Sequence, residues 1–311
     1  MVQRIGVIGA GRVGAVLAAA LRDAGHTLVA ASGQSPASRT RIETLLPEAV
    51  VADPHAVAQR ADLLLLTVPD DDLSAVVSDL VAAGVVRSDH VVVHTSGRHG
   101  VTALSPAAAV GARTVALHPA MTFTGTDIDL ERLSTCVFGV TTADEASAAV
   151  ARTLVADLGA TMTVVPEHDR ARYHAALAHG ANHLVTLVTQ AMGLLRQTGA
   201  TDPAGTLRPL LQAALDNALA YGDAALTGPV VRGDLETVAA HLDALGDSPA
   251  PTFDAYLAMA RATAELAVED GRLARARARQ IAATLDEAAW DETASSIADG
   301  ASPSGTWAER T

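Results

Sequence analysis

The sequence predicts an α/β fold in its first half and an all-α fold in its second half. Short apolar runs alternate with Ala- and Leu-rich helical stretches up to about residue 142, whereas only helical patterns follow residue 167. A continuous apolar run such as Leu63–Leu66 is typical of a strand that helices cover on both faces. Because strands that alternate with helices form a parallel sheet, we expect such a sheet in the first half.

The expected elements follow from the spacing of apolar residues and from the positions of glycine. Gly25, for example, is expected to end the first helix, since glycine readily adopts the positive φ of a helix terminus. Strands are expected at residues 4–8, 27–31, 62–68, 91–94, 114–118 and 136–140, with a short final strand at 160–165. Helices are expected at residues 12–24, 73–83, 143–158, 167–197, 206–225, 234–245 and 253–266.

These elements divide the chain into four segments. Residues 1–142 are expected to form the strand-and-helix domain, residues 143–166 a connecting helix and strand, and residues 167–286 a helical domain. Residues 287–311 lose helical periodicity and contain several Ser and Gly residues. We therefore expect a disordered tail there.

The composition narrows the classes of function. The chain has 22 basic and 35 acidic residues, which gives a formal net charge of −13 at pH 7. Because an acidic surface repels phosphate, we expect neither nucleic acid nor an anionic membrane as a partner. All of the basic residues are arginine, and the absence of lysine excludes a lysine Schiff base and a lysine proton donor.

The single cysteine, Cys136, excludes an internal disulfide and a cysteine-based metal cluster. Its apolar neighbours favour a buried strand residue over a catalytic thiol. No apolar run is long enough to span a membrane, and no signal-peptide pattern precedes the first strand. We therefore expect a cytoplasmic protein.

A G-x-G-x-x-G motif stands between the first expected strand and the first expected helix. Its residues are Gly9, Ala10, Gly11, Arg12, Val13 and Gly14. Gly9 permits a tight turn, Gly11 lets the backbone approach a pyrophosphate, and Gly14 lets the helix pack closely on the strand. The positive end of the helix dipole then faces the phosphates. This context predicts a dinucleotide-binding Rossmann domain and makes a glycine turn without a ligand the weaker alternative.

The end of the second strand favours NADP(H) over NAD(H). Enzymes that use NAD usually carry an acidic residue there, which binds the ribose 2′-hydroxyl. This chain instead has the small hydroxyls of Ser32 and Ser35, followed by Arg39 and Arg41. Because guanidinium binds phosphate in a bidentate manner, we expect both serines and Arg39 to contact the 2′-phosphate. Arg41 is also compatible with an ordinary solvated helix position.

Polar residues follow three further strands, and ligands of open α/β sheets bind beyond the carboxyl ends of strands. Val68 and Pro69 are expected to contact the cofactor beside the nicotinamide ribose. Two histidines end strands, His94 and His118, and histidine is well suited to donate a proton near neutral pH. For each histidine, a structural role in which the ring anchors a loop is equally compatible with the sequence. His94 is expected near the cofactor. Ser96 is expected either to bind the substrate or to cap a helix.

The long helix after the α/β domain carries His174 and Asn182. Positions eight residues apart lie about 80° apart around a helix, so the two side chains can flank one face. His174 is a candidate proton donor and Asn182 a candidate for orienting a carbonyl oxygen. His179 and His183 have a spacing that can bind metal, but no carboxylate matches them, and we favour surface or interface positions.

Two other polar groups have structural alternatives. The three aspartates at residues 70–72 are expected to begin a helix rather than to bind a metal, and no metal site is expected in the chain. Arg232 lies in a glycine-containing break between helices. It is equally compatible with binding a substrate carboxylate and with a structural ion pair.

With these motifs, the chain resembles the Rossmann-like proteins that carry the helical domain of unknown function 2520. These proteins are relatives of pyrroline-5-carboxylate reductase and of the 6-phosphogluconate dehydrogenase superfamily. The resemblance covers residues 3–285 and is carried by residues 9–14, 67–70, 94–97, 117–119, 173–174, 182, 217 and 226–234. Some members are thought to be alternative ketopantoate reductases. The resemblance implies a homodimer formed through the helical domain, with helices of both chains near each active site.

The chain differs from the larger superfamily at one catalytic position. The hydroxyacid dehydrogenases and ordinary ketopantoate reductases use a lysine on the helix after the Rossmann domain. Ala178 occupies that place here, and His174 lies about one turn away. Histidine is therefore expected to replace lysine as the proton donor.

These observations predict an NADPH-dependent reductase of a small anionic carbonyl compound, with 2-dehydropantoate as the best single substrate. His174 or His118 is expected to protonate the oxygen, while Asn182 and Ser96 hold the substrate. An imine reductase of the pyrroline-5-carboxylate type is the enzymatic alternative, and the break at Gly228 is compatible with it. A non-catalytic NADP-binding sensor or scaffold is the alternative from another class. The long helical half disfavours a deazaflavin-dependent oxidoreductase.

Overall fold

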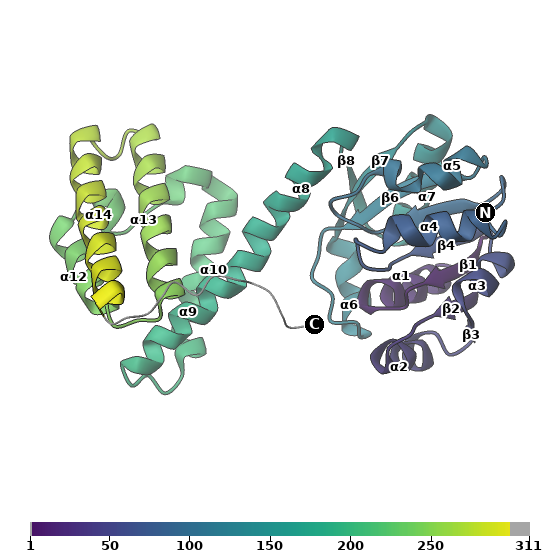
Figure 1. Ribbon diagram of the computed structural model, residues 1–311, viewed down its shortest axis with the longest axis horizontal. Coiled ribbons are helices and arrows are strands. Elements are labelled where there is room, and N and C mark those ends of the chain that lie inside the picture. The colour runs from purple at the N-terminus through teal and green to yellow at the C-terminus, as the bar shows by residue number, and fades with distance from the viewer. Residues whose placement is uncertain (1, 299–311) are drawn as a thin grey trace. The chain divides into compact units, whose positions relative to one another are not determined.

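The computed structural model describes residues 2–298 and divides into two compact units, the first ending at Asn182 and the second beginning at His183 (Figure 1). The first unit is an α/β domain and the second is all-α. The fold class expected from the sequence is therefore confirmed.

Within residues 2–298, the α/β unit contains one eight-stranded sheet in the order β3-β2-β1-β4-β5-β6-β7-β8. The strands are β1 (Arg4–Ile8), β2 (Thr27–Ser32), β3 (Val50–Val51), β4 (Leu63–Leu66), β5 (Val91–His94), β6 (Arg113–Pro119), β7 (Val137–Thr142) and β8 (Thr161–Val164). The first six strands are parallel. Because the chain moves outward from β1 in one direction and from β4 in the other, the strand order reverses between β1 and β4. Ligands of such sheets bind at that reversal.

The last two strands depart from the expected parallel arrangement. β7 pairs antiparallel with β6, with His118 opposite Gly139, and β8 is parallel to β7. The segment between β6 and β7 contains only short helices and returns to the edge of the sheet at which β6 ends, so β7 runs back along its neighbour. The segment 143–166, expected as a connector, belongs to the same unit: it forms α7 (Glu145–Asp157) and β8.

Helices cover both faces of the sheet (Figure 1). One face packs against α1 (Arg12–Asp23), α2 (Pro36–Leu45), α6 (Ile128–Arg132) and α7. The other packs against α3 (Pro54–Arg60), α4 (Leu73–Ala82) and α5 (Ser105–Ala109). Successive leucines of β4 alternate between these two cores, because neighbouring strand residues point to opposite faces. The expectation of a strand buried on both sides is confirmed.

The expected helix at 167–197 is interrupted. A 3₁₀ turn, η3 (Glu167–Asp169), precedes α8 (Arg170–Leu177), and a π-helical turn, η4 (Ala178–Asn182), separates α8 from α9 (His183–Gln197). A π-helical turn shifts the register of the side chains, which an apolar repeat along the sequence does not reveal. The angular relation expected between His174 and Asn182 therefore does not hold.

Up to residue 298, the second unit continues with five more helices and a 3₁₀ turn. After α9 come α10 (Pro203–Tyr221), η5 (Gly222–Ala225), α11 (Pro229–Arg232), α12 (Leu235–Leu245), α13 (Ala250–Glu269) and α14 (Arg275–Ala298). The buried core of the unit comes from α11 to α14 and the turn before α14. No helix within residues 2–298 is long and apolar enough to cross a membrane.

The sequence analysis placed the start of the disordered tail too early in the chain. Residues 287–298 continue α14, and residues 299–311 lie outside the described part of the chain. Ile281 and Leu285 of this helix are fully buried, so core packing stabilises the helix over the residues that precede 287. The Ala- and Glu-containing sequence that follows adds helical turns at little cost without an apolar repeat of its own.

Candidate active site

The glycine loop after β1 is fastened to both neighbouring strands. The N–H of Gly9 donates to the hydroxyl of Ser32 (3.2 Å), and the hydroxyl of Thr67 donates to the carbonyl of Gly9 (2.6 Å). Gly9 has a φ of +92°, and a Cβ there would lie 2.9 Å from the backbone nitrogen of Val68. Only glycine fits this turn, which joins the ends of β1, β2 and β4.

The start of α1 is open. A Cβ at Gly14 would collide with the hydroxyl of Thr67, whereas a Cβ at Gly11 would meet nothing closer than the Gly9 carbonyl at 3.8 Å. Gly11 is the N-cap residue, and no side chain caps the helix. The N–H groups of the first turn, which begins at Arg12, therefore have no capping side chain among the described residues.

The polar groups that follow β2 differ in their partners. Ser32 is buried and its hydroxyl accepts from Gly9, while Ser35 caps α2 by accepting from the N–H of Ser38 (3.1 Å). Arg39 is exposed, and its guanidinium has no ion-pair or hydrogen-bond partner among the described residues. The Nε of Arg41 lies against Gly125, where a Cβ would be 2.6 Å away. The same glycine also packs against Arg12.

The residues after β4 lie beside this loop. Val68 is half-buried and Pro69 is exposed. Asp70 and Asp71 both form ion pairs with Arg98, at 3.4 and 2.6 Å. The aspartates precede α4, as the sequence predicts.

His94 holds a loop through both ring nitrogens. Its Nδ1 accepts from the N–H of Ser96 (3.1 Å), and its Nε2 donates to the carbonyl of Gly100 (2.9 Å). The ring is fully buried, and burial lowers the pKa of His94 to about 4. The Ser96 hydroxyl accepts from the N–H of His99 (3.2 Å). His94 and Ser96 therefore have structural partners in the loop after β5.

His118 has a different environment. Its Nδ1 lies 3.0 Å from the hydroxyl of Tyr173, and its Nε2 has no hydrogen-bond partner among residues 2–298. The ring meets Tyr173 and His174 edge to face, at centroid distances of 5.6 and 5.8 Å. Burial, together with the positive charge of Arg170, lowers the pKa of His118 to about 4. The imidazole is therefore neutral near pH 7.

Gly97 lies between the rings of His118 and His174. A Cβ at this position would overlap the ring of His174 and would lie 3.0 Å from Nε2 of His118. The missing side chain lets both rings pack directly against the backbone of Gly97. This cluster lies at the carboxyl ends of β5 and β6.

Arg170 is a site residue that the sequence analysis missed. Its side chain is 1% exposed, and it donates to the carbonyls of His99 (2.8 Å), Gly139 (3.1 Å) and Ser96. It therefore ties the loop after β5 to β7. The available signal was the spacing of Arg170, Tyr173 and His174, which places them on one face of a helix.

Two further candidate residues are exposed. Asn182 is exposed and lies in the π-helical turn, where its side chain has no hydrogen bond among the described residues. Arg232 is exposed at the end of α11. Cys136 is buried as expected, and burial raises the pKa of its thiol to about 11.

Residues 2–119 match the model of a Rossmann-like domain, and residues 136–263 match the model of the domain of unknown function 2520. The chain therefore joins a match to a Rossmann-like domain with a match to a DUF2520 domain. The resemblance seen in the motifs is thus confirmed, and the DUF2520 match begins before β7 and covers most of the helical unit.

Several solved structures share the fold. A candidate NADP oxidoreductase from Bacteroides fragilis is 22% identical with a TM-score of 0.73, over 85% of this chain and 98% of that one. An imine reductase from a Pseudomonas species is 19% identical with a TM-score of 0.59, over 84% and 93%. A pyrroline carboxylate reductase from Plasmodium falciparum is 11% identical with a TM-score of 0.55, over 91% and 98%. No curated protein matches the chain in sequence.

Proposed function

We propose that this protein is an NADP(H)-dependent reductase of a small anionic compound with a C=O or C=N bond. The observation that carries the proposal is the packing of His118 and His174 against Gly97, where Nε2 of His118 has no hydrogen-bond partner among residues 2–298, at the same edge of the sheet as the uncapped start of α1. A cofactor site and a pair of proton-bearing side chains at one edge suit hydride transfer followed by protonation.

The residues present fit a dinucleotide. Residues 9–14 offer the uncapped first turn of α1 and open space over Gly11 to the pyrophosphate. Arg39 would bind the 2′-phosphate, and Val68 and Pro69 would border the nicotinamide ribose. Ser32 and Ser35 support this region through their backbone partners. When bound, the cofactor supplies a hydride to the substrate carbon.

The side chains at Gly97 would complete the reaction. Nε2 of His118 donates a hydrogen bond to the substrate oxygen and stabilises the negative charge that develops there. His174 in its protonated form gives its proton to that oxygen and later regains one from water. The buried positive charge of Arg170, which has no carboxylate within hydrogen-bond distance among residues 2–298, favours an anionic substrate. Asn182 remains a predicted contact to the substrate.

The best single substrate is 2-dehydropantoate, which would be reduced to pantoate. Reduction of a cyclic imine is the alternative activity. Proteins named as imine reductases and pyrroline carboxylate reductases share this fold. An imine arrives with its proton, so it would depend less on His174. A sensor that binds NADP without turnover is the remaining alternative.

The deciding experiment follows the loss of NADPH absorbance with a panel of 2-oxo acids and cyclic imines. 2-Dehydropantoate is tested first and pyrroline-5-carboxylate second, and NADH is run in parallel. Turnover faster with NADPH than with NADH is the expected result. Tight NADPH binding without turnover on any member of the panel would contradict the reductase and favour the sensor.

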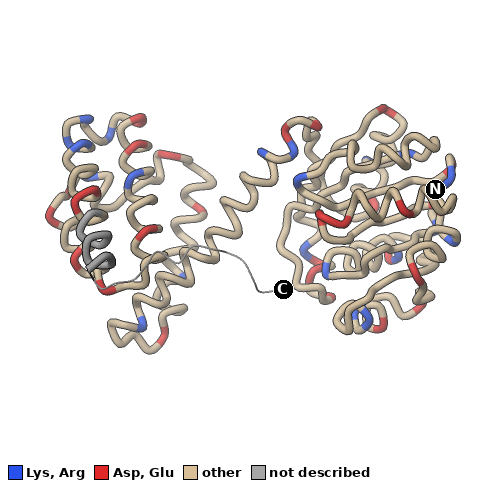
Figure 2. The backbone as a smooth tube through the Cα atoms, in the orientation of Figure 1, with Lys and Arg blue, Asp and Glu red and all other residues tan. Residues whose placement is uncertain are grey.

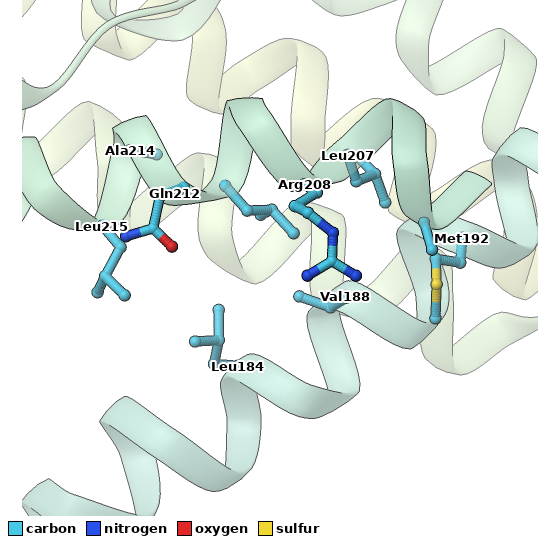
Figure 3. Close-up of a pocket in the computed structure, with 10 residues that line it drawn as sticks. Leu184, Val188, Met192, Leu207, Arg208, Gln212, Ala214 and Leu215 are labelled. Carbon is cyan, nitrogen blue, oxygen red and sulfur yellow. The ribbon is translucent and has the colours of Figure 1, made fainter. Parts of the chain in front are cut away.

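We also propose that the helical unit forms a homodimer through α9 and α10. Neither helix has a buried residue, and Figure 2 shows few charges along them. Leucines of both helices line a groove of about 380 Å³, toward which Arg208 projects (Figure 3). Leu210 and Leu219 are 65% and 80% exposed. Apolar surface of this extent is typical of an interface between copies of a chain.

Sedimentation equilibrium tests the dimer. The native chain is expected to sediment as a dimer and Leu215→Arg as a monomer, because the arginine would place a charge in the apolar groove. Leu266→Arg, at a similarly exposed leucine of α13, is the matched control and should remain dimeric. A monomeric native chain would contradict the proposal.

A further inference from the structure

Tyr173 is half-buried beside His118, and the mechanism proposed above gives it no role. Its hydroxyl lies 3.0 Å from Nδ1 of His118. A Cβ at Gly139 would lie 2.5 Å from the same hydroxyl oxygen, so the phenol rests directly on the backbone of β7. Gly139 is also the residue that pairs with His118 across the two strands. The phenol and the imidazole therefore share one strand pair.

The direction of this hydrogen bond follows from the acceptors available to the phenol. Nδ1 of His118 is the one acceptor within hydrogen-bond distance of the Tyr173 hydroxyl among residues 2–298. If Nδ1 carried the proton of the neutral ring, the phenolic hydrogen would have no acceptor. The phenol therefore donates its hydrogen to Nδ1 of His118.

We propose that Tyr173 is a positioning residue, which keeps the single proton of the neutral His118 ring on Nε2 and directs that nitrogen toward Gly97. A neutral imidazole has one N–H, and the nitrogen that accepts a hydrogen bond carries none. With Nδ1 accepting from Tyr173, the N–H stands at Nε2, 3.0 Å from the position that a Cβ of Gly97 would take. Without the phenol, the ring is free to carry its proton on Nδ1, where no substrate atom can use it.

Arg170 holds the phenol in place. Its guanidinium carbon lies 5.6 Å from the centroid of the Tyr173 ring, and it donates to the carbonyl of Gly139. The same residue therefore fixes both the ring and the strand on which the ring rests. This inference rests on the proposed function for its catalytic consequence, but the position of the proton is a property of the free protein.

The chain offers a matched control. In the helical unit, the hydroxyl of Tyr256 lies 3.0 Å from Nδ1 of His241, with ring centroids 5.9 Å apart. This second pair has nearly the same geometry, but it is exposed and lies in another unit. Tyr256→Phe thus removes the same kind of hydrogen bond in a different unit.

The test is ¹⁵N NMR of the histidine rings in the full chain near pH 7, without cofactor. In the native protein, Nδ1 of His118 is expected at the shift of an unprotonated ring nitrogen and Nε2 at that of a protonated one. Tyr173→Phe should move both shifts toward each other and lower kcat about 10-fold with the KM for NADPH unchanged, as expected for one lost hydrogen bond. Tyr256→Phe should change neither the His118 shifts nor kcat.

The outcomes separate the inference from the proposed function. A native His118 that carries its proton on Nδ1 would overturn the inference whether or not the protein turns over a substrate. Unchanged kcat in Tyr173→Phe, despite shifted resonances, would overturn the catalytic consequence. Gly139→Ala, which pushes the phenol away from the strand, gives a second variant and should reproduce the effects of Tyr173→Phe. Absence of turnover in the native protein would count against the proposed function alone.

Discussion

His94 and His118 end neighbouring strands of one sheet, and burial lowers the pKa of each to about 4, yet their ring nitrogens are used differently. Both nitrogens of His94 bind the backbone of the loop that follows its strand. In His118, Nδ1 is paired with Tyr173, and Nε2 has no partner among the described residues. Of the two rings, only His118 keeps a nitrogen available for a ligand.

The same contrast separates the groups that follow β2. The hydroxyls of Ser32 and Ser35 accept from backbone N–H groups, whereas the guanidinium of Arg39 has no partner within residues 2–298. A buried polar group that the protein already satisfies stabilises a turn, and one left unsatisfied or exposed at a cleft is available for a ligand. Position at the end of a strand does not distinguish the two cases.

The largest effect is expected from His118→Ala. Loss of the hydrogen bond to the substrate oxygen should lower kcat about 1,000-fold, within the range for one donor that stabilises a developing oxyanion, and should leave the KM for NADPH nearly unchanged. Stopped-flow measurement of NADPH oxidation checks this. His94→Ala, assayed under the same conditions at a temperature where it stays folded, should lose far less; equal losses for the two variants would remove the distinction between them.

The next effect concerns stability against pH. Below pH 6.5 the unfolded chain takes up a proton on His94, but the folded chain does so only near its pKa of about 4. The stabilisation from neutral His94 is therefore complete above pH 6.5 and is lost as the pH falls to 4, by about 3 kcal/mol at most. Urea unfolding of His94→Gln should show a weaker decline than the native chain across this interval. An identical decline would show that His94 is not held neutral.

A somewhat smaller effect is expected from Gly97→Ala. The added methyl group overlaps the His174 ring and approaches Nε2 of His118, so the two rings must separate. Displacement of catalytic groups by about 1 Å typically costs about 100-fold in rate, and a decrease of that size in kcat is expected. Gly246→Ala is the control, since a Cβ there meets nothing closer than 3.5 Å. Full activity in Gly97→Ala would mean that the substrate binds elsewhere.

The smallest effect is expected at the cofactor. Arg39→Ala should lower the preference for NADPH over NADH about 10-fold in kcat/KM, because one charge-assisted contact to the 2′-phosphate is lost. Ser35→Ala removes a helix cap and should lower the melting temperature while changing the preference little. If the preference falls in Arg41→Ala rather than in Arg39→Ala, the phosphate lies toward Gly125, and the contact belongs to Arg41.

The sequence predicts local structure well where a backbone conformation requires one particular residue type. Gly9 and Gly25 have φ values of +92° and +99°, as their expected turn and helix-end positions demand. The antiparallel β7 was missed because strand direction depends on the edge to which a loop returns, which composition does not record. The π-helical turn was missed because it adds no distinct residue pattern.

The candidate site could be predicted only in part, for a related reason. His118 and His174 were expected at the site, and the structure brings them together around Gly97. The engagement of His94 within its own loop depends on the path of that loop, and the burial of Arg170 depends on three carbonyls from distant segments. A loop path and contacts between distant segments are properties of the folded chain.

The most direct test of the account is a crystal structure of the protein with NADP⁺ and an unreactive 2-oxo acid. The account predicts the pyrophosphate at the first turn of α1 and the nicotinamide ring facing the carbonyl carbon of the oxo acid, whose oxygen accepts a hydrogen bond from Nε2 of His118. A nicotinamide ring that faces away from Gly97, with His118 in contact with neither cofactor nor substrate, would contradict it.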